Sequence, residues 1–452
     1  MAESTTPKEE VVQEQRTEGM VAAALGTGME WFDWGIYGIF LPFFAVSFFD
    51  PENAFAASLG AWVVFAVGFL ARPVGGILFG RIGDLRGRKR SMVLVSAAAG
   101  IGSTLIALGP TFQQVGIFAA LLLVTARIIQ GLAHGGEMPA AGAFISEVSK
   151  PHNRGAWSSI IYVFGNIGQG VGFLLAALLT TLLPNSAMVS WGWRIAFGIG
   201  AAGSFAAMFY RMSVKETAVF AVEQAKKPKP QIWKEIWKAR KKALQIIGMS
   251  IGLTVTFYLA TTVLGAYHIN VLGQQLYGWD PLTGAAGAAG ISKTAYAAQV
   301  NWVTLGVLIP YIASLPLLGW LSDKIGRRPV MWYTTVGIAL VTVPLLTWLN
   351  GEIYRLGIAV AVMLLLLGGA SAIFPALMAE LVPTQIRTTG VALPYALATG
   401  IFGGTAPYLQ QWMSANWGAN TFGWYVAAMM LISAITVITI PETKGIDMRD
   451  VR

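Results

Sequence analysis

The chain repeats one polar stretch, Gly80-Arg81-Ile82-Gly83-Asp84-Leu85-Arg86-Gly87-Arg88-Lys89, as Gly319-Trp320-Leu321-Ser322-Asp323-Lys324-Ile325-Gly326-Arg327-Arg328. The same acid and base recur downstream of each copy, since Glu147 precedes Arg154 by the interval at which Glu380 precedes Arg387. Internal repeats of this kind are typical of secondary transporters, whose binding site lies between two related halves near the membrane midplane. The repeat therefore predicts two similar halves.

Apolar segments surround both copies of the repeat. Of 452 residues, 55% are hydrophobic and 12% are charged, with a mean hydropathy of +0.61, whereas a soluble domain has about 25% charged residues. Stretches of about 20 apolar residues occur at 20–49, 55–80, 91–109, 116–147, 156–183, 193–213, 243–272, 296–321, 330–349, 355–382, 386–414 and 421–440. We expect an all-α membrane protein with twelve transmembrane helices in two six-helix pseudo-symmetric bundles.

A basic segment divides the two bundles. The expected parts are a cytoplasmic tail at 1–18, bundles at 19–213 and 243–440, a linker at 214–242 and a second tail at 441–452. In the linker, Trp233 and Trp237 stand among lysines at helical spacing, which favours an amphipathic helix on the inner leaflet. A solvated linker is the alternative.

The charge distribution predicts the topology. The chain has 31 basic and 22 acidic residues, and most of the basic ones fall in the tails, the linker and the loops of one face. By the positive-inside rule that face is the cytoplasm, so both termini are expected there and the chain is expected to be multi-pass in the cell (inner) membrane. Nucleic-acid binding is not needed to explain the +9 net charge. The absence of cysteine excludes disulfides and thiolate sites.

Two carboxylates, Glu30 and Asp33, lie inside the first apolar segment, where an unpaired charge is costly. At about 1.5 Å of rise per residue, they are roughly 15–20 Å from the cytoplasmic face. Arg127 in the fourth segment is roughly 17 Å from the outer face, so all three lie near the middle of the membrane. A buried guanidinium needs acceptors, and the two acids are its expected partners.

Proton coupling follows as a hypothesis. Two acids three residues apart resist ionising together, so one is expected to hold a proton at neutral pH. If an anionic substrate competes for Arg127, a carboxylate is freed and its proton affinity rises. A permanent structural ion pair is the alternative. The polar face continues toward the cytoplasm through Gln130, His134 and Glu137, as a proton exit or a second substrate contact, although a histidine satisfied within the core is equally consistent with the pattern.

Uncharged side chains supply further candidates for substrate contact. They are Tyr37, Tyr162, Asn166 and Gln169 in the first half, and Tyr267, His268, Asn301 and Tyr395 in the second. Apart from His268, no acid or base lies deep in the second half, so we expect that half to supply uncharged hydrogen bonds. The glycines near Asn166 are typical of close helix packing. The three histidines stand on separate elements, so neither a metal site nor a cofactor is predicted.

The paired loops, the six-plus-six spans and Arg127-Ile128-Ile129-Gln130-Gly131 resemble the major facilitator superfamily. Gly28-Met29-Glu30-Trp31-Phe32-Asp33-Trp34, Arg72-Pro73, Gly135-Gly136-Glu137 and Trp191-Gly192-Trp193-Arg194 resemble its metabolite:proton symporters, which carry oxoglutarate, citrate, shikimate, or proline and betaine. Pro441-Glu442-Thr443-Lys444-Gly445 also resembles sugar porters. The resemblance implies that contacts among a set of gating residues latch the inner face: Asp84, Arg88, Glu147, Arg154, Asp323, Arg327, Glu380 and Arg387. Asp84 and Asp323 can each lie against a helix N-terminus of the opposite half, and Arg88 can reach Glu147. A topological role for the basic residues is the alternative.

The predicted function is proton-coupled symport of a small organic acid, such as oxoglutarate or citrate, by alternating access. Arg127 would hold a carboxylate, and Glu30 and Asp33 would carry the proton. A zwitterion such as proline or betaine is the second candidate, and efflux stays open. A membrane-embedded enzyme would need a nucleophile with a base or a metal cluster, and a channel would not need the paired loops. The expected partners are the substrate, protons and lipid, with the chain monomeric.

Overall fold

The computed structural model describes residues 7–86, 88–135, 142, 145–146, 149–213, 239–280, 283–383, 386–418, 420–448 and 451. The helices of the first half are α1 (Pro7–Phe48), α2 (Ala54–Arg86), α3 (Arg88–Leu108), α4 (Phe112–Val115), α5 (Phe118–Ala133), η1 (Pro151–Asn153), α7 (Arg154–Leu182), α8 (Asn185–Ala187), η2 (Met188–Gly192) and α9 (Trp193–Ser213). Those of the second half are α12 (Arg240–Tyr258), η3 (Leu259–Val263), α13 (Leu264–Tyr267), η4 (His268–Leu272), α14 (Gly273–Tyr277), α15 (Lys293–Ile325), α16 (Arg327–Trp348), α17 (Ile353–Leu381), α18 (Arg387–Ala398), η6 (Thr399–Gly403), α19 (Gly404–Trp417) and α20 (Thr421–Thr439).

Ten helices of the described chain are long and apolar enough to cross a membrane. Two more segments occupy the places of the fourth and eleventh predicted spans. One is α5, which is apolar but short, and the other is the run from α18 through η6 to α19. The predicted all-α membrane architecture is confirmed.

One predicted boundary differs in the structure. The α1 helix begins at Pro7, so residues 7–18, expected as a tail, continue the first helix, because Glu, Gln and Lys there are good helix formers. The predicted amphipathic helix at 232–237 lies outside the described residues.

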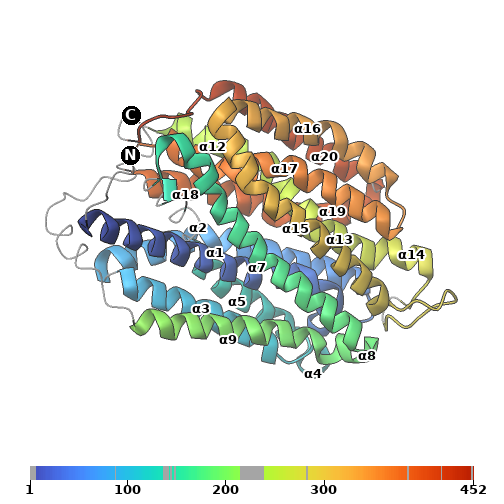
Figure 1. Ribbon diagram of the computed structural model, residues 1–452. Helices are drawn as coiled ribbons and strands as arrows, with labels where there is room; N and C mark the ends of the chain where they lie inside the picture. The colour runs from blue at the N-terminus through green and yellow to red at the C-terminus, as the bar shows by residue number, and fades with distance from the viewer. Residues whose placement is uncertain are drawn as a thin grey trace.

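The helix pairings repeat between the halves. In the first half α1 packs on α7, α2 on α5 and α3 on α9. In the second half the equivalent pairs are α12 with α18 and η6, α15 with α17, and α16 with α20. Figure 1 shows the two halves side by side, with the start of α1 and the segment after α20 at the same end of the molecule. The same pairing scheme therefore builds both bundles.

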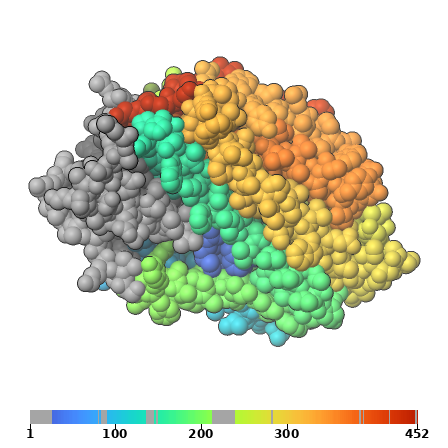
Figure 2. Space-filling view, viewed as in Figure 1, coloured from blue at the N-terminus to red at the C-terminus, as the bar shows by residue number. Residues whose placement is uncertain are grey.

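Two helices of the first half, α7 and α2, make most of the contacts with the second half, and α7 packs on α17 as well as on α15. The α7 helix lies along α15 (Figures 1 and 2), and α2 packs against α18, η6 and α19. Glycine permits the first contact, because a side chain on Gly155 of α7 would meet the backbone of Gly319 on α15. Within the first half, Gly168 of α7 similarly contacts the backbone of Gly28 on α1. Gly168 thus has the packing role that the sequence analysis expects of the glycines near Asn166.

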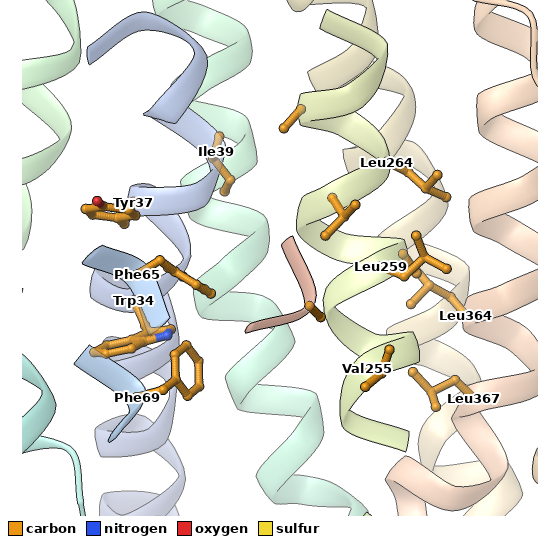
Figure 3. Packing of buried hydrophobic residues seen from close by; sticks show 14 of the residues in the cluster. Trp34, Tyr37, Ile39, Phe65, Phe69, Val255, Leu259, Leu264, Leu364 and Leu367 are labelled. Atoms are coloured by element: carbon orange, nitrogen blue, oxygen red, sulfur yellow. The ribbon is translucent and has the colours of Figure 1, made fainter. Parts of the chain in front are cut away.

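Buried apolar side chains of both halves form one core cluster. Figure 3 shows Trp34 of α1 beside Phe65 and Phe69 of α2, and Val255 of α12 near Leu367 of α17 on the other side. The Trp34 ring meets the Phe69 ring edge-on at 4.7 Å between centroids. These aromatic residues stand between the first-half core and the space between the bundles.

Candidate functional site

A central cavity lies between the two halves. The first half lines it with the charged or polar side chains Glu30, Arg72, His134 and Gln169. The second half contributes hydroxyl groups from Ser250, Thr254, Tyr258, Thr262, Ser371, Tyr395 and Thr399. Aromatic rings complete the lining: Trp31, Trp34, Phe65, Phe257 and Phe374. Among the described lining residues, the charged groups come from the first half and uncharged donors come from the second, which is the division expected from the sequence.

Asp33 lies behind this lining and is nearly inaccessible, with 1% of its surface exposed. Ser103 on α3 donates a hydrogen bond to its Oδ1. Gln130 on α5 donates to its Oδ2 at 3.0 Å, and His134 Nε2 lies 3.4 Å from the same oxygen. Hydrogen bonds to a charged group contribute about 1.5–3 kcal/mol each, so the buried carboxylate is well solvated by protein groups.

Arg127 occupies a different position from the one expected. Its guanidinium donates to Gln130 Oε1 at 2.9 Å and lies against the rings of Trp34 and Tyr37, at 3.8 and 4.3 Å from their centroids. Arg127 is fully buried and does not line the cavity. The expected direct pairing with Asp33 is therefore wrong, because Gln130 lies between the two groups.

The guanidinium that does line the cavity belongs to Arg72 on α2. Its Cζ atom lies 4.0 Å from the Trp34 ring centroid and 4.2 Å from that of Phe69. Its Nε atom makes no hydrogen bond with any residue that the structure describes. The sequence contained the signal, a cation before Pro73 within an apolar span, but depth alone favoured Arg127 as the central cation.

His134 connects the cavity to the buried acid. Its Nδ1 lies 3.9 Å from Glu30 Oε1, and its Nε2 faces Asp33. His134 follows the last residue of α5, and its backbone N–H still donates to Gln130 O at 3.1 Å. The imidazole thus lies between Glu30 and Asp33 and contacts Asp33 more closely. The fourth predicted member of this set, Glu137, lies outside the described residues.

The other predicted contact residues divide into two groups. Tyr162, Gln169 and Tyr395 line the cavity. The remaining predicted residues are absent from the lining: Tyr37, Asn166, Tyr267, His268 and Asn301. Tyr37 instead donates to Ala61 O at 2.8 Å, and His268 lies 3.1 Å from the Tyr296 hydroxyl. The two π-helical segments η3 and η4 explain part of this difference, because each extra residue rotates the following side chains away from an α-helical pattern.

Inter-half contacts form around the second repeat. Asp323 on α15 accepts hydrogen bonds from Gly155 N and Ala156 N, at 2.9 and 3.0 Å, in the first turn of α7. This is the contact that the sequence analysis expects of an acid against a helix N-terminus of the opposite half. The side chains of Asp84, Arg88 and Glu147, in the first repeat, lie outside the description.

Glu380 completes this cluster. It pairs with Arg154 of the first half at 3.1 Å and with Arg327 of its own half at 3.3 Å. Arg387, a predicted gating residue, donates to the carbonyl oxygens of Ala379 and Val382 and of Met448 near the end of the chain. Two guanidiniums from different halves thus share one buried carboxylate.

Glu442 was not among the predicted site residues, and its segment was noted only for its resemblance to sugar porters. Its carboxylate accepts from Arg327 N at 2.8 Å and Arg328 N at 3.1 Å and so caps α16. Burial opposes ionisation, but these backbone donors outweigh it and hold the pKa of Glu442 below its ordinary value. The last segment of the chain is thereby fastened to the second repeat.

Comparison with known proteins agrees with this architecture. Residues 19–452 match the family described as "Sugar (and other) transporter". The chain is 33% identical to the alpha-ketoglutarate permease of Escherichia coli, over 99% of this chain and 100% of that protein. It is 29% identical to the citrate-proton symporter of Salmonella typhi, over 93% of each chain. It is also 27% identical to the proline/betaine transporter of Escherichia coli, over 95% of this chain and 84% of the other.

Solved structures share the fold. The partially occluded inward-open form of the xylose transporter XylE from Escherichia coli superposes with a TM-score of 0.70, covering 96% of this chain and 99% of that one. The sequence identity is 18%, so this likeness concerns the fold alone. A further structure of the same transporter is described as a major facilitator superfamily proton:xylose symporter. The family match over residues 19–452 and the similarity to the permease and the symporters confirm the resemblance inferred from the sequence motifs.

Proposed function

Because the chain belongs to the sugar (and other) transporter family of the major facilitator superfamily, we propose that it imports a small organic acid together with protons by alternating access. The observation that carries this proposal is the cavity itself. It is shared by both halves, and it presents Arg72 next to an acid and an imidazole.

Arg72 is the proposed anchor for the substrate carboxylate. Its guanidinium is partly exposed and lines the cavity, and its planar group suits bidentate binding of a carboxylate. Hydroxyl groups of Thr254, Thr262 and Tyr258 on the facing bundle can donate to a second carboxylate or an oxo group. This chemistry favours a dicarboxylate or oxo-acid, and the role first assigned to Arg127 passes to Arg72.

Glu30, His134 and Asp33 form the proposed proton path. A proton on Glu30 passes to His134 Nδ1, and the proton on Nε2 passes to Asp33 Oδ2, which leaves a neutral imidazole. The present separations of 3.9 and 3.4 Å must shorten during transfer. The His134 side chain then links substrate binding near Glu30 to the protonation of Asp33.

Contacts between the halves at both ends of the cavity support alternating access. At one end lie the bonds from Asp323 to α7 and the Glu380 cluster. At the other end Lys293 of α15 donates to Pro42 O at 2.6 Å, and Ser58 of α2 donates to Gln411 of α19 at 3.0 Å. We assign the Asp323 end to the cytoplasm from the positive-inside pattern, which also puts both termini there.

A zwitterion such as proline or betaine is the second candidate. Glu30 lines the same cavity as Arg72. The Trp31 ring stands edge-on to Phe257 at 5.2 Å and to Tyr162 at 5.3 Å. An acid beside aromatic faces suits a cationic group, with the substrate carboxylate at Arg72.

Counterflow in proteoliposomes tests the proposal. Labelled oxoglutarate is exchanged against unlabelled dicarboxylates, tricarboxylates, proline and betaine, with Arg72→Gln compared with Arg81→Gln, an exposed arginine on the same helix. We expect competition by carboxylates and a rise in KM of about 10- to 100-fold for Arg72→Gln alone, as for loss of a charge-assisted bond. An unchanged KM would refute the anchor. Competition by betaine without competition by dicarboxylates would select the zwitterion.

A further inference from the structure

Asp33 lies in a closed polar compartment beside the cavity. Of the described side chains that line the cavity, His134 is the one that contacts Asp33. Ser103 of α3 and Gln130 of α5 bound the compartment, and both are fully buried. The third wall is Gly200 of α9, where an added methyl group would lie 2.8 Å from Asp33 Oδ1 and 3.7 Å from Ser103 Oγ. The absence of a side chain at Gly200 leaves the carboxylate in contact with Ser103.

The directions of the hydrogen bonds made by Gln130 and Ser103 follow from Arg127. A guanidinium can only donate, so Gln130 must present its oxygen to Arg127 and its amide nitrogen to the other partners. That nitrogen donates to Asp33 Oδ2 at 3.0 Å and to Ser103 Oγ at 2.8 Å. Since the Ser103 oxygen already accepts this bond, its own proton points to Asp33 Oδ1. Each carboxylate oxygen of Asp33 therefore accepts one hydrogen bond in this arrangement, Oδ1 from Ser103 and Oδ2 from Gln130.

Few other charges face Asp33. On its own helix the nearest acid is Glu30, and α5 contributes His134 and Arg127. The described neighbours on α3 and α9, Ser103 and Gly200, carry no charge. Apart from the α5 groups, Ser103 is thus the described donor to Asp33. A hydroxyl that donates to a carboxyl group stabilises the ionised form of that group more than its protonated form.

We propose that Ser103 is a positioning residue that sets the proton affinity of Asp33 and hence the pH range over which the transporter loads its proton. The proposal rests on the proposed proton-coupled function. Arg127 acts in this arrangement by orienting Gln130 and Ser103, while Arg72 faces the substrate. Gly200 belongs to the same arrangement, because its lack of a side chain allows Ser103 to contact the Asp33 carboxylate.

The test is the pH dependence of uptake in proteoliposomes. Ser103→Ala removes one donor to the carboxylate, so the proton is bound more tightly and the external pH of half-maximal uptake rises by about one to two units. Ser103→Thr keeps the hydroxyl and is expected to keep the wild-type midpoint. Gly200→Ala pushes the carboxylate away from Ser103 and raises the midpoint without removing the hydroxyl. Gly198→Ala is the matched control, because its added methyl meets no atom within 4 Å.

Two outcomes would overturn the inference. One is a wild-type midpoint in both Ser103→Ala and Gly200→Ala. The other is an effect of Ser103→Ala on the pH profile of exchange that persists when Asp33→Asn is also present. Uptake by the wild-type protein that does not respond to pH would instead refute the proposed proton coupling itself.

Discussion

Replacing Asp323 by asparagine is expected to open the inner face of the cavity. In the structure the two carboxylate oxygens accept bonds from Gly155 N and Ala156 N at the start of α7, and Oδ1 also pairs with Arg327 at 2.8 Å. Asparagine is nearly isosteric but has one acceptor oxygen and no charge. It therefore loses a backbone bond across the two halves and the favourable interaction with the helix N-terminus.

The size of the effect follows from these contacts. A bond to a charged acceptor contributes about 1.5–3 kcal/mol, and the asparagine oxygen retains one of the two backbone donors. The closed inner face thus loses about 1.5–3 kcal/mol. This shifts the equilibrium between inner-closed and inner-open forms by about 10- to 150-fold.

Labelling of a cavity cysteine measures this shift. The chain has no cysteine, so Ser250→Cys, a buried lining position, is a single reporter for a maleimide added at the cytoplasmic side. Asp323→Asn is expected to increase its labelling rate. Asp50→Asn, an acid with a local bond to Glu52 N at 3.0 Å, is the control. Equal labelling rates in Asp323→Asn and the control would show that Asp323 does not hold the inner face closed.

Three further outcomes are expected. Gly168→Ala should lower the thermal unfolding temperature in detergent relative to Gly198→Ala, because the methyl group meets the Gly28 backbone and overpacking costs about 1–3 kcal/mol; equal temperatures would contradict this. Glu442 stabilises the fold above the ordinary carboxyl pKa, and its contribution disappears as the pH falls through its lowered pKa. The unfolding temperature of Glu442→Gln should therefore fall less between pH 7 and pH 4 than that of the wild type. Lys293→Met removes a bond of 2.6 Å to the first half and should increase labelling of the cavity cysteine from the outer side, whereas an unchanged rate would exclude Lys293 from the outer contact.

Much of the architecture was predictable because the bilayer acts on each segment separately. Hydropathy identified the spans, and the recurrence at Asp84 and Asp323 indicated two related bundles. The contact of Asp323 with a helix of the opposite half followed from the same reasoning, since a helix N-terminus favours an anion.

The candidate site was predictable only in part. Glu30 and His134 line the cavity as expected for proton-coupling residues, because deep ionisable groups in a membrane protein face its interior. Depth in the membrane could not show whether Arg127 or Arg72 faces the cavity, because depth does not give the direction in which a side chain points. Ser103 gave no signal at all, because a serine in an apolar span is common.

The sequence by itself determined a membrane protein with repeated halves, most of its positive charge on one face and acids deep in the first span, because composition, periodicity and charge are local properties of each segment. Only the tertiary structure decided that Arg72 faces the cavity, that Gln130 separates Arg127 from Asp33, and that Ser103 donates to the buried acid. These relations join residues on α1, α2, α3 and α5. They depend on how the helices rotate and pack, which the pattern within any one helix does not contain.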